Sequence, residues 1–236
     1  MTVPTLPSVA LAQRAERWFG HPGRVLDVLP LTAGLLQVEL VVDHLRNRPW
    51  SPGQEVEFRV DARAFRHYTP AVVDPATGRL EIVFSLDADG PGTRWVQGLA
   101  AGDDVAMMGP GGGLRRRPRP QQLLLGDATT LGLFAALLRD RAASRYDGAV
   151  EVAAGDEDAA AALVPGLTVL TRQAEPGVAL LDWLGEHPPH RPDEVAACLA
   201  GHVPTMQRLR GRLLALGLSR RAVSLKAHWS TGRQGL

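Results

Sequence analysis

The chain has 236 residues, of which 45% are hydrophobic, and its 26 Lys and Arg residues nearly balance 25 Asp and Glu residues. This apolar content is sufficient for a packed core and excludes wholesale disorder, and the length allows one large domain or two smaller ones. A net charge of +1 argues against a dedicated nucleic-acid-binding protein, because such proteins bind through an excess of cations.

Single residues exclude further kinds of chemistry. Cys198 is the only cysteine, so neither an internal disulfide nor a zinc site made of several thiolates can form. Lys226 is the only lysine, which excludes a phosphate-loop lysine. The first twenty residues carry Arg14, Glu16 and Arg17 among short apolar runs, so no signal peptide is expected. No apolar run approaches the ~20 residues that cross a bilayer. We therefore expect a soluble, cytoplasmic protein without a membrane span.

The first half of the chain is predicted to be mainly β-structure. Apolar residues at helical spacing predict a helix over residues 8–19, which Gly20 and Pro22 end. Short alternating or β-branched runs then predict six strands, over residues 24–31, 35–42, 55–61, 66–73, 80–86 and 104–108. A helical piece over residues 93–101 precedes the last strand. Short strands joined by Gly- and Pro-rich turns are typical of a closed antiparallel barrel.

Residues 109–120 (GPGGGLRRRPRP) form the strongest break in the sequence. Four glycines and three prolines exclude a helix or a central strand here. We therefore place a domain boundary in this segment. The predicted organisation is an N-terminal extension over residues 1–20, the barrel over 21–114, a linker over 115–120 and a second domain over 121–236.

The second domain is predicted to alternate strands with helices. Apolar runs predict strands over residues 122–125, 149–154, 167–171 and 195–200, and helices over 131–141, 178–185 and 204–216. This alternation is typical of an α/β domain with a parallel sheet, which binds ligands at the carboxyl ends of its strands. Cys198 falls in an apolar strand and is expected to be inert core.

Several well-known sites are absent from the sequence. It has no G-x-S-x-G nucleophile elbow, no phosphate loop and no H-E-x-x-H. His187 and His190 flank two prolines, which deny them helical ligand spacing, so a solvated loop is expected. Gly111 to Gly113 do not open a strand–turn–helix unit and are not a dinucleotide fingerprint. No metal site is predicted.

The segment Arg66-His67-Tyr68-Thr69 carries the most informative chemistry. Arginine can grip a diphosphate with two hydrogen bonds, tyrosine can pack on a ring system, and threonine can bond a ring nitrogen. Together they suit a flat, phosphate-bearing ligand. An exposed arginine beside a half-buried tyrosine explains the segment equally well when it is taken alone.

The order of segments along the chain gives this motif its context. A barrel with R-x-Y-T is followed by G-P-G-T-R-W, a strand that ends in Gly-Asp, and a βαβ half. This order resembles the siderophore-interacting protein family of FAD-binding ferric-siderophore reductases, in the ferredoxin-reductase-like superfamily. The resemblance runs from about residue 24 to the C-terminus. Five segments carry it: 65–70, 89–113, 123–132, 199–210 and 226–236.

The resemblance implies a fold and a cofactor site. The fold is a six-stranded antiparallel FAD-binding barrel followed by an α/β NAD(P)H-binding-like domain. Arg66 would meet the diphosphate, Tyr68 would pack along the flavin and Thr69 would bond near its N5, so Tyr68 and Thr69 are the expected catalytic residues. The turn from Gly90 to Arg94 would present backbone N–H groups to the same diphosphate. The implied cofactor-binding set is Arg66, His67, Tyr68, Thr69, Asp87, Gly90, Gly92, Thr93, Arg94, Trp95, Gly126, Asp127, Thr129, Thr130, Gly201 and Trp229.

Several of these residues have plainer interpretations. Trp95 can equally plug the end of the barrel. The family uses the Gly126–Thr130 turn beside the nicotinamide and the flavin, but Asp127 or Thr129 can simply cap a helix. His202 stands where the family usually has an acidic residue, and helix capping is its expected role. His228-Trp229 matches the family's closing aromatic pair, and it either covers the flavin or seals the sheet edge.

The resemblance implies an enzyme that takes electrons from NAD(P)H or reduced ferredoxin and reduces a ferric siderophore, with release of Fe(II). Two alternatives stay open: a general NAD(P)H flavin oxidoreductase for a small electron-transfer protein, and a flavin-carrying siderophore-binding module without turnover. A monomer is expected. An anionic ferric siderophore would favour a basic entrance, although a solvated arginine face is the plainer interpretation. The candidate residues are Arg115, Arg116, Arg117, Arg119, Arg208, Arg210, Arg212 and Lys226.

Overall fold

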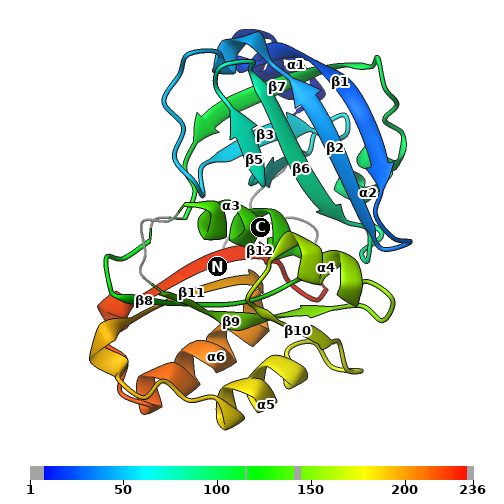
Figure 1. Ribbon diagram of the computed structural model, residues 1–236. Helices are drawn as coiled ribbons and strands as arrows, with labels where there is room; N and C mark the ends of the chain where they lie inside the picture. Colours follow the sequence, from blue (N-terminus) through cyan, green and yellow to red (C-terminus); the bar gives the residue numbers. More distant parts are fainter. Residues whose placement is uncertain (1–7, 115, 141–144, 233–236) are drawn as a thin grey trace.

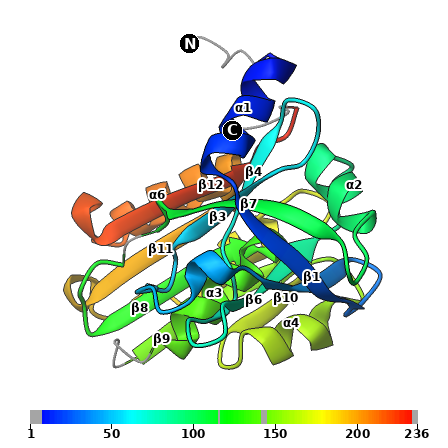
Figure 2. The ribbon, with the colours of Figure 1, turned by 90° about the horizontal axis from the view of Figure 1, so that it is seen from above.

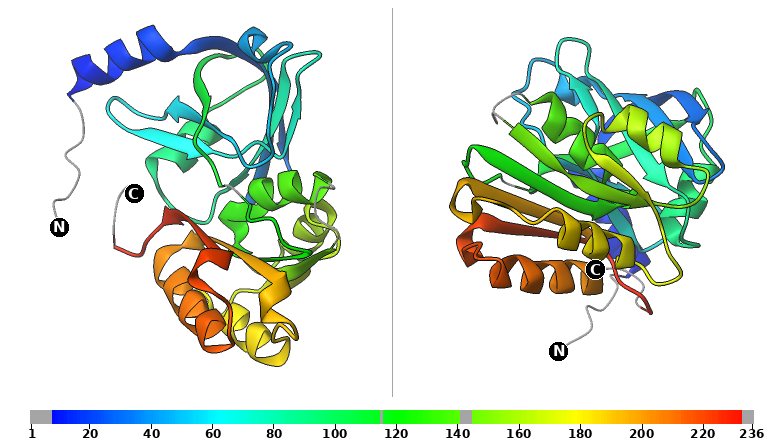
Figure 3. Two further views of the ribbon diagram at one scale, coloured as in Figure 1. Left: turned by 90° about the vertical axis from the view of Figure 1, so that its left-hand side faces the viewer. Right: turned by 60° about the horizontal axis from the view of Figure 1, so that its bottom comes forward.

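The computed structural model describes residues 8–114, 116–140 and 145–232 and contains two β-sheets, one above the other in Figure 1. The N-terminal sheet is antiparallel and has seven strands in the order β4-β3-β7-β1-β2-β6-β5. Its strands are β1 (His21–Pro30), β2 (Leu35–Val41), β3 (Glu55–Arg59), β4 (Phe65–Tyr68), β5 (Val72–Asp74), β6 (Arg79–Ser85) and β7 (Asp104–Gly111). Helix α1 (Val9–Phe19) leads into β1 at the margin of the molecule (Figures 2 and 3).

The seventh strand arises because the predicted strand over residues 66–73 is two strands. Pro70 has no backbone N–H to give to a ladder, so β4 ends at Tyr68 and β5 begins at Val72. These consecutive strands lie at opposite edges of the sheet. Four residue steps span at most about 14 Å, so the two edges must approach each other and the sheet must curl into a barrel. The predicted barrel fold is confirmed, with seven strands in place of six.

The helix predicted over residues 93–101 begins earlier and is shorter. Helix α2 (Pro91–Gln97) starts on a proline, which suits the first helical position because its missing N–H has no partner there. Gly98 ends the helix, and its N–H bonds back to the carbonyls of Trp95 and Val96.

The C-terminal sheet is parallel, with five strands in the order β10-β9-β8-β11-β12. Its strands are β8 (Gln121–Asp127), β9 (Arg145–Val152), β10 (Thr168–Thr171), β11 (Val195–His202) and β12 (Val223–Trp229). The helices are α3 (Leu131–Arg139), α4 (Glu157–Leu163), α5 (Val178–Glu186) and α6 (Val203–Ala215). Short 3₁₀ turns are η1 (Asp43–Leu45), η2 (Ala128–Thr130), η3 (Pro192–Glu194) and η4 (Arg220–Ala222). The predicted parallel α/β domain is confirmed.

Helices cover both faces of this sheet (Figure 1). Leu124 and Cys198 face α3 and α4, whereas Leu123, Leu125 and Leu199 face α5 and α6. Neighbouring residues of a strand point to opposite faces, so each strand contributes to two apolar cores. Cys198 is buried, and its burial raises the pKa of the thiol to about 12, which fits an inert core residue.

Two elements were missed by the sequence patterns. Helix α4 is built mainly from alanines, whose small side chains give a weak apolar period. Strand β12 lies at the edge of the sheet and alternates exposed with half-buried residues, so it does not read as a buried apolar run.

The barrel packs on the α3 side of the parallel sheet. Leu35 and Val83 of the barrel join Leu131 and Phe134 of α3 in one buried apolar cluster. Polar contacts cross the same boundary and join Lys226 to Glu55 at 2.5 Å, Arg172 to Asp87 at 2.8 Å and Thr32 to Asp156 at 2.5 Å. These contacts frame the space between the two layers. No helix within the described residues is long and apolar enough to cross a membrane.

Candidate functional site

A cavity of about 750 Å³ lies between the barrel and the parallel sheet, and we call it the interlayer cavity. One wall comes from β4, the loop after β6 and the start of α2. The other comes from the carboxyl ends of β8, β9, β11 and β12. Predicted site residues that line it are Arg66, His67, Tyr68, Thr69, Asp87, Gly90, Gly92, Thr93, Asp127, Thr129 and Trp229. Predicted residues outside its lining are Arg94, Trp95, Gly126, Thr130 and Gly201.

Tyr68 anchors the barrel wall of the cavity. Its ring lies 4.7 Å from that of Phe84 between centroids, and burial raises the pKa of its hydroxyl to about 12, so the phenol stays protonated. The start of α2 comes close to this hydroxyl. A Cβ on Gly92 would lie 2.5 Å from it, so only glycine lets the helix begin here.

Arg66 lies beside Tyr68 on the barrel wall. Its Nη1 donates to the Phe65 carbonyl at 2.8 Å, and Arg66 forms no salt bridge with any residue that the structure describes. Neighbouring His67 is exposed at the cavity lining, and its Nε2 lies 3.2 Å from Glu57 Oε1. Within the part of the chain that the structure describes, Arg66 is therefore a cation of the barrel wall that is not held in a salt bridge.

The α2 turn combines open backbone with occupied side chains. A Cβ on Gly90 would meet nothing within 4 Å, so the backbone there is open to the cavity. The Thr93 hydroxyl donates to the Ala88 carbonyl at 2.6 Å, and Arg94 pairs with Asp89 at 2.6 Å. The guanidinium of Arg94 is thus held outside the cavity lining.

Trp95 has a packing environment in the barrel. Its ring lies 5.1 Å from Phe58 and 6.2 Å from Phe84 between centroids, and it packs against the buried barrel core. These contacts match the interpretation in which Trp95 plugs the barrel end.

Asp127 organises the opposite wall. Its Oδ1 accepts from the Thr129 N–H at 3.0 Å and the Thr129 hydroxyl at 2.5 Å, which is the predicted N-cap. Its Oδ2 accepts from the His202 N–H at 2.8 Å and from Trp229 Nε1 at 2.9 Å. Gly201 has φ +101°, and a Cβ there would collide with the same carboxylate. We call Asp127, Thr129, His202 and Trp229 the Asp127 network; it ties together β8, β11 and β12.

His202 does not cap a helix with its side chain. It occupies the N-cap position of α6, but its ring makes no capping hydrogen bond to the backbone. Instead Nδ1 lies 2.9 Å from the Thr205 hydroxyl and Nε2 lies 3.0 Å from the Thr231 hydroxyl. The Thr205 hydroxyl donates to the Pro176 carbonyl at 3.1 Å, so Nδ1 must carry the proton that Thr205 accepts. Burial lowers the pKa of His202 and favours this neutral form.

The aromatic pair before the tail lies on the same wall. Trp229 stacks on the His202 ring with centroids 4.2 Å apart. His228 Nδ1 lies 3.0 Å from the Thr129 hydroxyl, which already donates to Asp127, so Nδ1 is the donor. Burial lowers the pKa of His228 as well.

Two buried carboxylates in the cavity lining were not anticipated. Glu151 is 2% exposed, accepts from the Gly177 N–H at 2.9 Å, and has its pKa raised by burial. Glu55 is 6% exposed and pairs with Lys226 across the layers at 2.5 Å. The sequence did carry one signal for Glu151, since it is a charged residue inside an otherwise apolar run.

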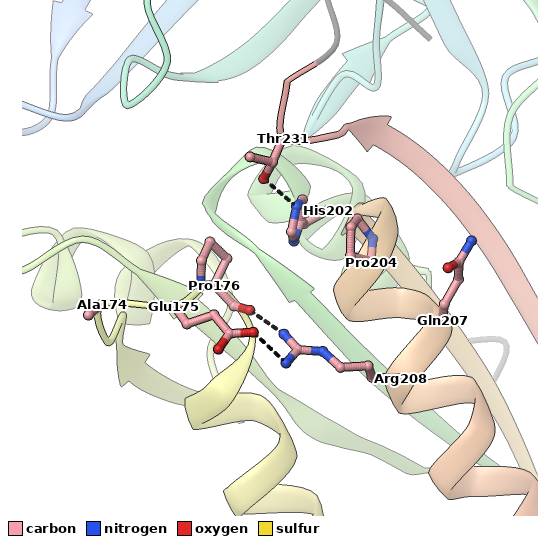
Figure 4. A pocket seen from close by; sticks show the side chains of 8 residues that line it. All are labelled: Ala174, Glu175, Pro176, His202, Pro204, Gln207, Arg208 and Thr231. Carbon is pink, nitrogen blue, oxygen red and sulfur yellow. Dashed lines mark hydrogen bonds and ion pairs between the residues drawn. The ribbon is translucent and has the colours of Figure 1, made fainter.

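A second cavity, of about 730 Å³, adjoins the first and shares Pro176, His202 and Thr231 with it. It lies at the carboxyl edge of the parallel sheet, between the residues that precede α5 and the first turns of α6 (Figure 4). Arg208 and Glu175 face each other at its margin (Figure 4).

The basic residues that were candidates for a siderophore entrance do not gather at one cavity. Arg116 pairs with Asp140 and bonds the Tyr146 hydroxyl, and Arg115 lies outside the described residues. Of the remaining candidates, Arg208 lines the second cavity and Lys226 lines the interlayer cavity. Neither cavity is lined by Arg117, Arg119, Arg210 or Arg212. These four match the interpretation of a solvated arginine face.

Residues 30–114 match the family model of the siderophore-interacting FAD-binding domain. The predicted resemblance to siderophore-interacting proteins is confirmed. The matched segment contains β2 to β7 and therefore the whole barrel wall of the interlayer cavity. This match supports FAD as the cofactor and a flavin oxidoreductase as the class of protein. No curated protein shows significant sequence similarity to the chain.

Solved structures share the two-layer fold. A siderophore utilization protein from T. fusca is 24% identical, with a TM-score of 0.77 over 92% of this chain and 95% of its own. A siderophore-interacting protein from Acinetobacter baumannii is 15% identical, with a TM-score of 0.74 over 92% of each chain. The ferredoxin reductase in carbazole 1,9a-dioxygenase is 19% identical, with a TM-score of 0.68 over 89% of this chain and 69% of its own. At these identities the likeness establishes the fold.

Proposed function

We propose that this chain is an FAD-dependent reductase that takes electrons from NAD(P)H or reduced ferredoxin and reduces Fe(III) in a siderophore, so that Fe(II) is released. The observation that carries the proposal is the interlayer cavity, whose barrel wall lies in the segment matched as a siderophore-interacting FAD-binding domain. When bound, FAD would convert a two-electron donor into a source of single electrons for the iron.

The barrel wall fits FAD. Arg66 offers a guanidinium that forms no salt bridge with a described residue, which suits a diphosphate. The open backbone at Gly90 and the close approach at Gly92 leave N–H groups at the start of α2 for the same anion. Tyr68 adds an aromatic face that is fixed by its neighbours Phe84 and Trp95, so little conformational freedom would be lost on binding.

The Asp127 network holds the facing wall in one arrangement. It fixes Trp229, whose Nε1 donates to Asp127, and it holds the His202 backbone, while the His202 ring donates from Nδ1 to Thr205 beside the network. Such a wall would exclude water from one side of the cofactor and orient the approach of a donor. Electron transfer to iron requires no acid or base, so these groups serve to position and to shield.

The donor would dock at the carboxyl edge of the parallel sheet. Nucleotides bind outside the carboxyl ends of strands in open α/β sheets. The second cavity lies at this edge and opens beside His202 and Thr231, where it meets the interlayer cavity. A dinucleotide that spans both cavities would bring one end to the cofactor. The cytoplasmic location and the monomeric state remain predictions.

The first experiment is an absorbance spectrum of the purified protein, taken before and after incubation with excess FAD and repeated for Arg66→Ala. We expect a flavin spectrum that is lost or strongly reduced in the variant. Arg79→Ala is the matched control, because Arg79 belongs to the same barrel but pairs with Glu39 and does not line the cavity. A wild-type protein that stays colourless in excess FAD would contradict the proposal.

The second experiment tests turnover. Under anaerobic conditions NADH, NADPH or reduced ferredoxin should bleach the bound flavin, and a ferric hydroxamate or ferric catecholate should restore its colour while an Fe(II) chelator reports iron release. If none of the three donors bleaches the flavin, the chain is better described as a flavin-carrying siderophore-binding module.

A general NAD(P)H flavin oxidoreductase for a small electron-transfer protein is the second candidate. The fold shared with a ferredoxin reductase favours it. The same bleached protein distinguishes the two. Reoxidation by ferredoxin or cytochrome c, without reoxidation by ferric siderophores, would favour this candidate.

A further inference from the structure

The second cavity has the composition of a neutral nucleotide pocket. Pro176 and Pro204 give it apolar surface, and Gln207 and Thr231 give it uncharged hydrogen-bonding groups. His202 is neutral there because burial lowers its pKa. Among the described residues that line it, Arg208 is the one permanent cation and Glu175 is the one carboxylate.

The charge of Arg208 is already satisfied. Its Nη1 donates to Glu175 Oε1 at 2.7 Å and its Nη2 donates to the Pro176 carbonyl at 2.6 Å (Figure 4). The fork of the guanidinium is thus occupied by two acceptors that precede α5. The side chain of Glu175 is 69% exposed, so its carboxylate faces any ligand that enters from solvent.

This arrangement bears on the one chemical difference between NADPH and NADH. NADPH carries a phosphate on the 2′-oxygen of its adenosine ribose, where NADH carries a hydroxyl. An acidic residue suits the hydroxyl because it accepts its hydrogen bond, whereas an arginine suits the phosphate. Glu175 supplies the acid and also neutralises the arginine.

We propose that Glu175 makes the donor pocket select NADH over NADPH, because its carboxylate repels a 2′-phosphate and occupies the arginine that would bind it. This inference rests on the proposed use of a nicotinamide donor. It assigns the adenosine end of the donor to the second cavity and makes Glu175 a specificity-determining residue.

The test measures binding rather than turnover. Isothermal titration calorimetry of the FAD-loaded protein with 5′-AMP and with adenosine 2′,5′-bisphosphate compares the two adenosine ends without nicotinamide. We expect the wild type to bind 5′-AMP more tightly. In Glu175→Gln, the affinity for the bisphosphate relative to 5′-AMP should rise by roughly two- to fivefold, a range that matches solvent-exposed charge pairs. The Pro176 carbonyl would keep Arg208 in place in this variant.

Two further variants make the test specific. Glu175→Gln combined with Arg208→Ala should lose the gain, because the gain depends on the freed guanidinium. Glu194→Gln is the matched control. It frees Arg191 from a comparable surface pair at 2.9 Å, but neither residue lines the second cavity, so the ratio should stay at the wild-type value.

The outcomes separate this inference from the proposed function. A wild-type preference for the bisphosphate, or a ratio that is unchanged in Glu175→Gln, would overturn the role of Glu175 even if NADH bleaches the flavin. If neither nucleotide binds while NADH bleaches the flavin, the second cavity is not the adenosine site and the reductase proposal stands. If no nicotinamide donor binds or bleaches, the proposed donor fails and this inference fails with it.

Discussion

The two walls of the interlayer cavity are built in different ways. The barrel wall comes mainly from β4, the end of β6 and the turn that leads into α2, and its cation, Arg66, forms no salt bridge among the described residues. The sheet wall comes from strands that are far apart in the chain, and its polar groups satisfy one another through Asp127. A wall whose cation is not held in a salt bridge is organised for a ligand, whereas a wall whose polar groups bond one another is organised for its own stability.

This contrast predicts that the sheet wall responds to mutation mainly through stability. Asp127→Ala would leave the His202 N–H, Trp229 Nε1 and two Thr129 donors without their acceptor. We expect the free energy of unfolding, measured in urea, to fall by about 3 kcal/mol. Asp103→Ala is a suitable control, because Asp103 caps one exposed turn through the Ala100 N–H, and its loss should cost less than about 1 kcal/mol. If both variants lost the same free energy of unfolding, the Asp127 network would not be a special source of stability in the sheet wall.

Lys226 and Glu55 join the two walls, and their pair should show the next largest effect. Lys226→Met leaves Glu55 buried without its partner, and we expect a loss of about 2 kcal/mol in the free energy of unfolding. Adding Glu55→Gln should recover most of this loss, because the uncompensated charge disappears. Arg24→Met breaks an exposed pair with Asp104 and should change stability by less than about 0.5 kcal/mol. A double variant no more stable than Lys226→Met would contradict the explanation.

The barrel wall should respond mainly through cofactor affinity. In Gly92→Ala the new Cβ would lie 2.5 Å from the Tyr68 hydroxyl, so the ring or the start of α2 must shift. We expect FAD affinity, followed by flavin fluorescence, to fall about tenfold, with a stability loss below about 1 kcal/mol. Gly211→Ala provides the control, since its Cβ meets nothing within 4 Å and Gly211 lies in α6, outside the cavity lining. If both variants retain wild-type affinity, the close approach at Gly92 has no part in the site.

The barrel wall was predictable because its information is local. Arg66, Tyr68 and Thr69 are adjacent in sequence, and the glycines of the α2 turn follow at a short distance. Two local errors remain. Pro70 divides a predicted strand into β4 and β5, which lie at opposite edges of the sheet, and α2 spans Pro91–Gln97 where a helix over residues 93–101 was predicted.

The sheet wall was only partly predictable because it depends on strand order. The cap at Asp127 is local and was anticipated. Its bonds to His202 and Trp229 exist because β8 and β12 flank β11, and no pattern within one segment encodes that order. The same reason hides the pairing of Lys226 with Glu55, which are separated by most of the chain. Placing His202 as a helix cap followed from its position, but its ring bonds two threonine hydroxyls instead.

The pH dependence of stability is the smallest effect that we predict, and it tests whether the sheet wall keeps His228 neutral. Burial lowers the pKa of His228 below its ordinary value, although Asp127 and Glu55 act in the opposite direction and Lys226 acts with burial. The unfolded chain therefore binds more protons than the folded chain once the pH drops below about 6.5. The contribution of His228 to the free energy of unfolding should be constant above this value and should decline as the pH falls toward the lowered pKa of the folded state. Burial also lowers the pKa of His202, so its protonation destabilises the fold in the same direction.

In His228→Gln the decline in stability between pH 7.5 and pH 5.5, followed by urea unfolding, should be shallower than in the wild type. An unchanged slope would mean that His228 is not held neutral by the sheet wall.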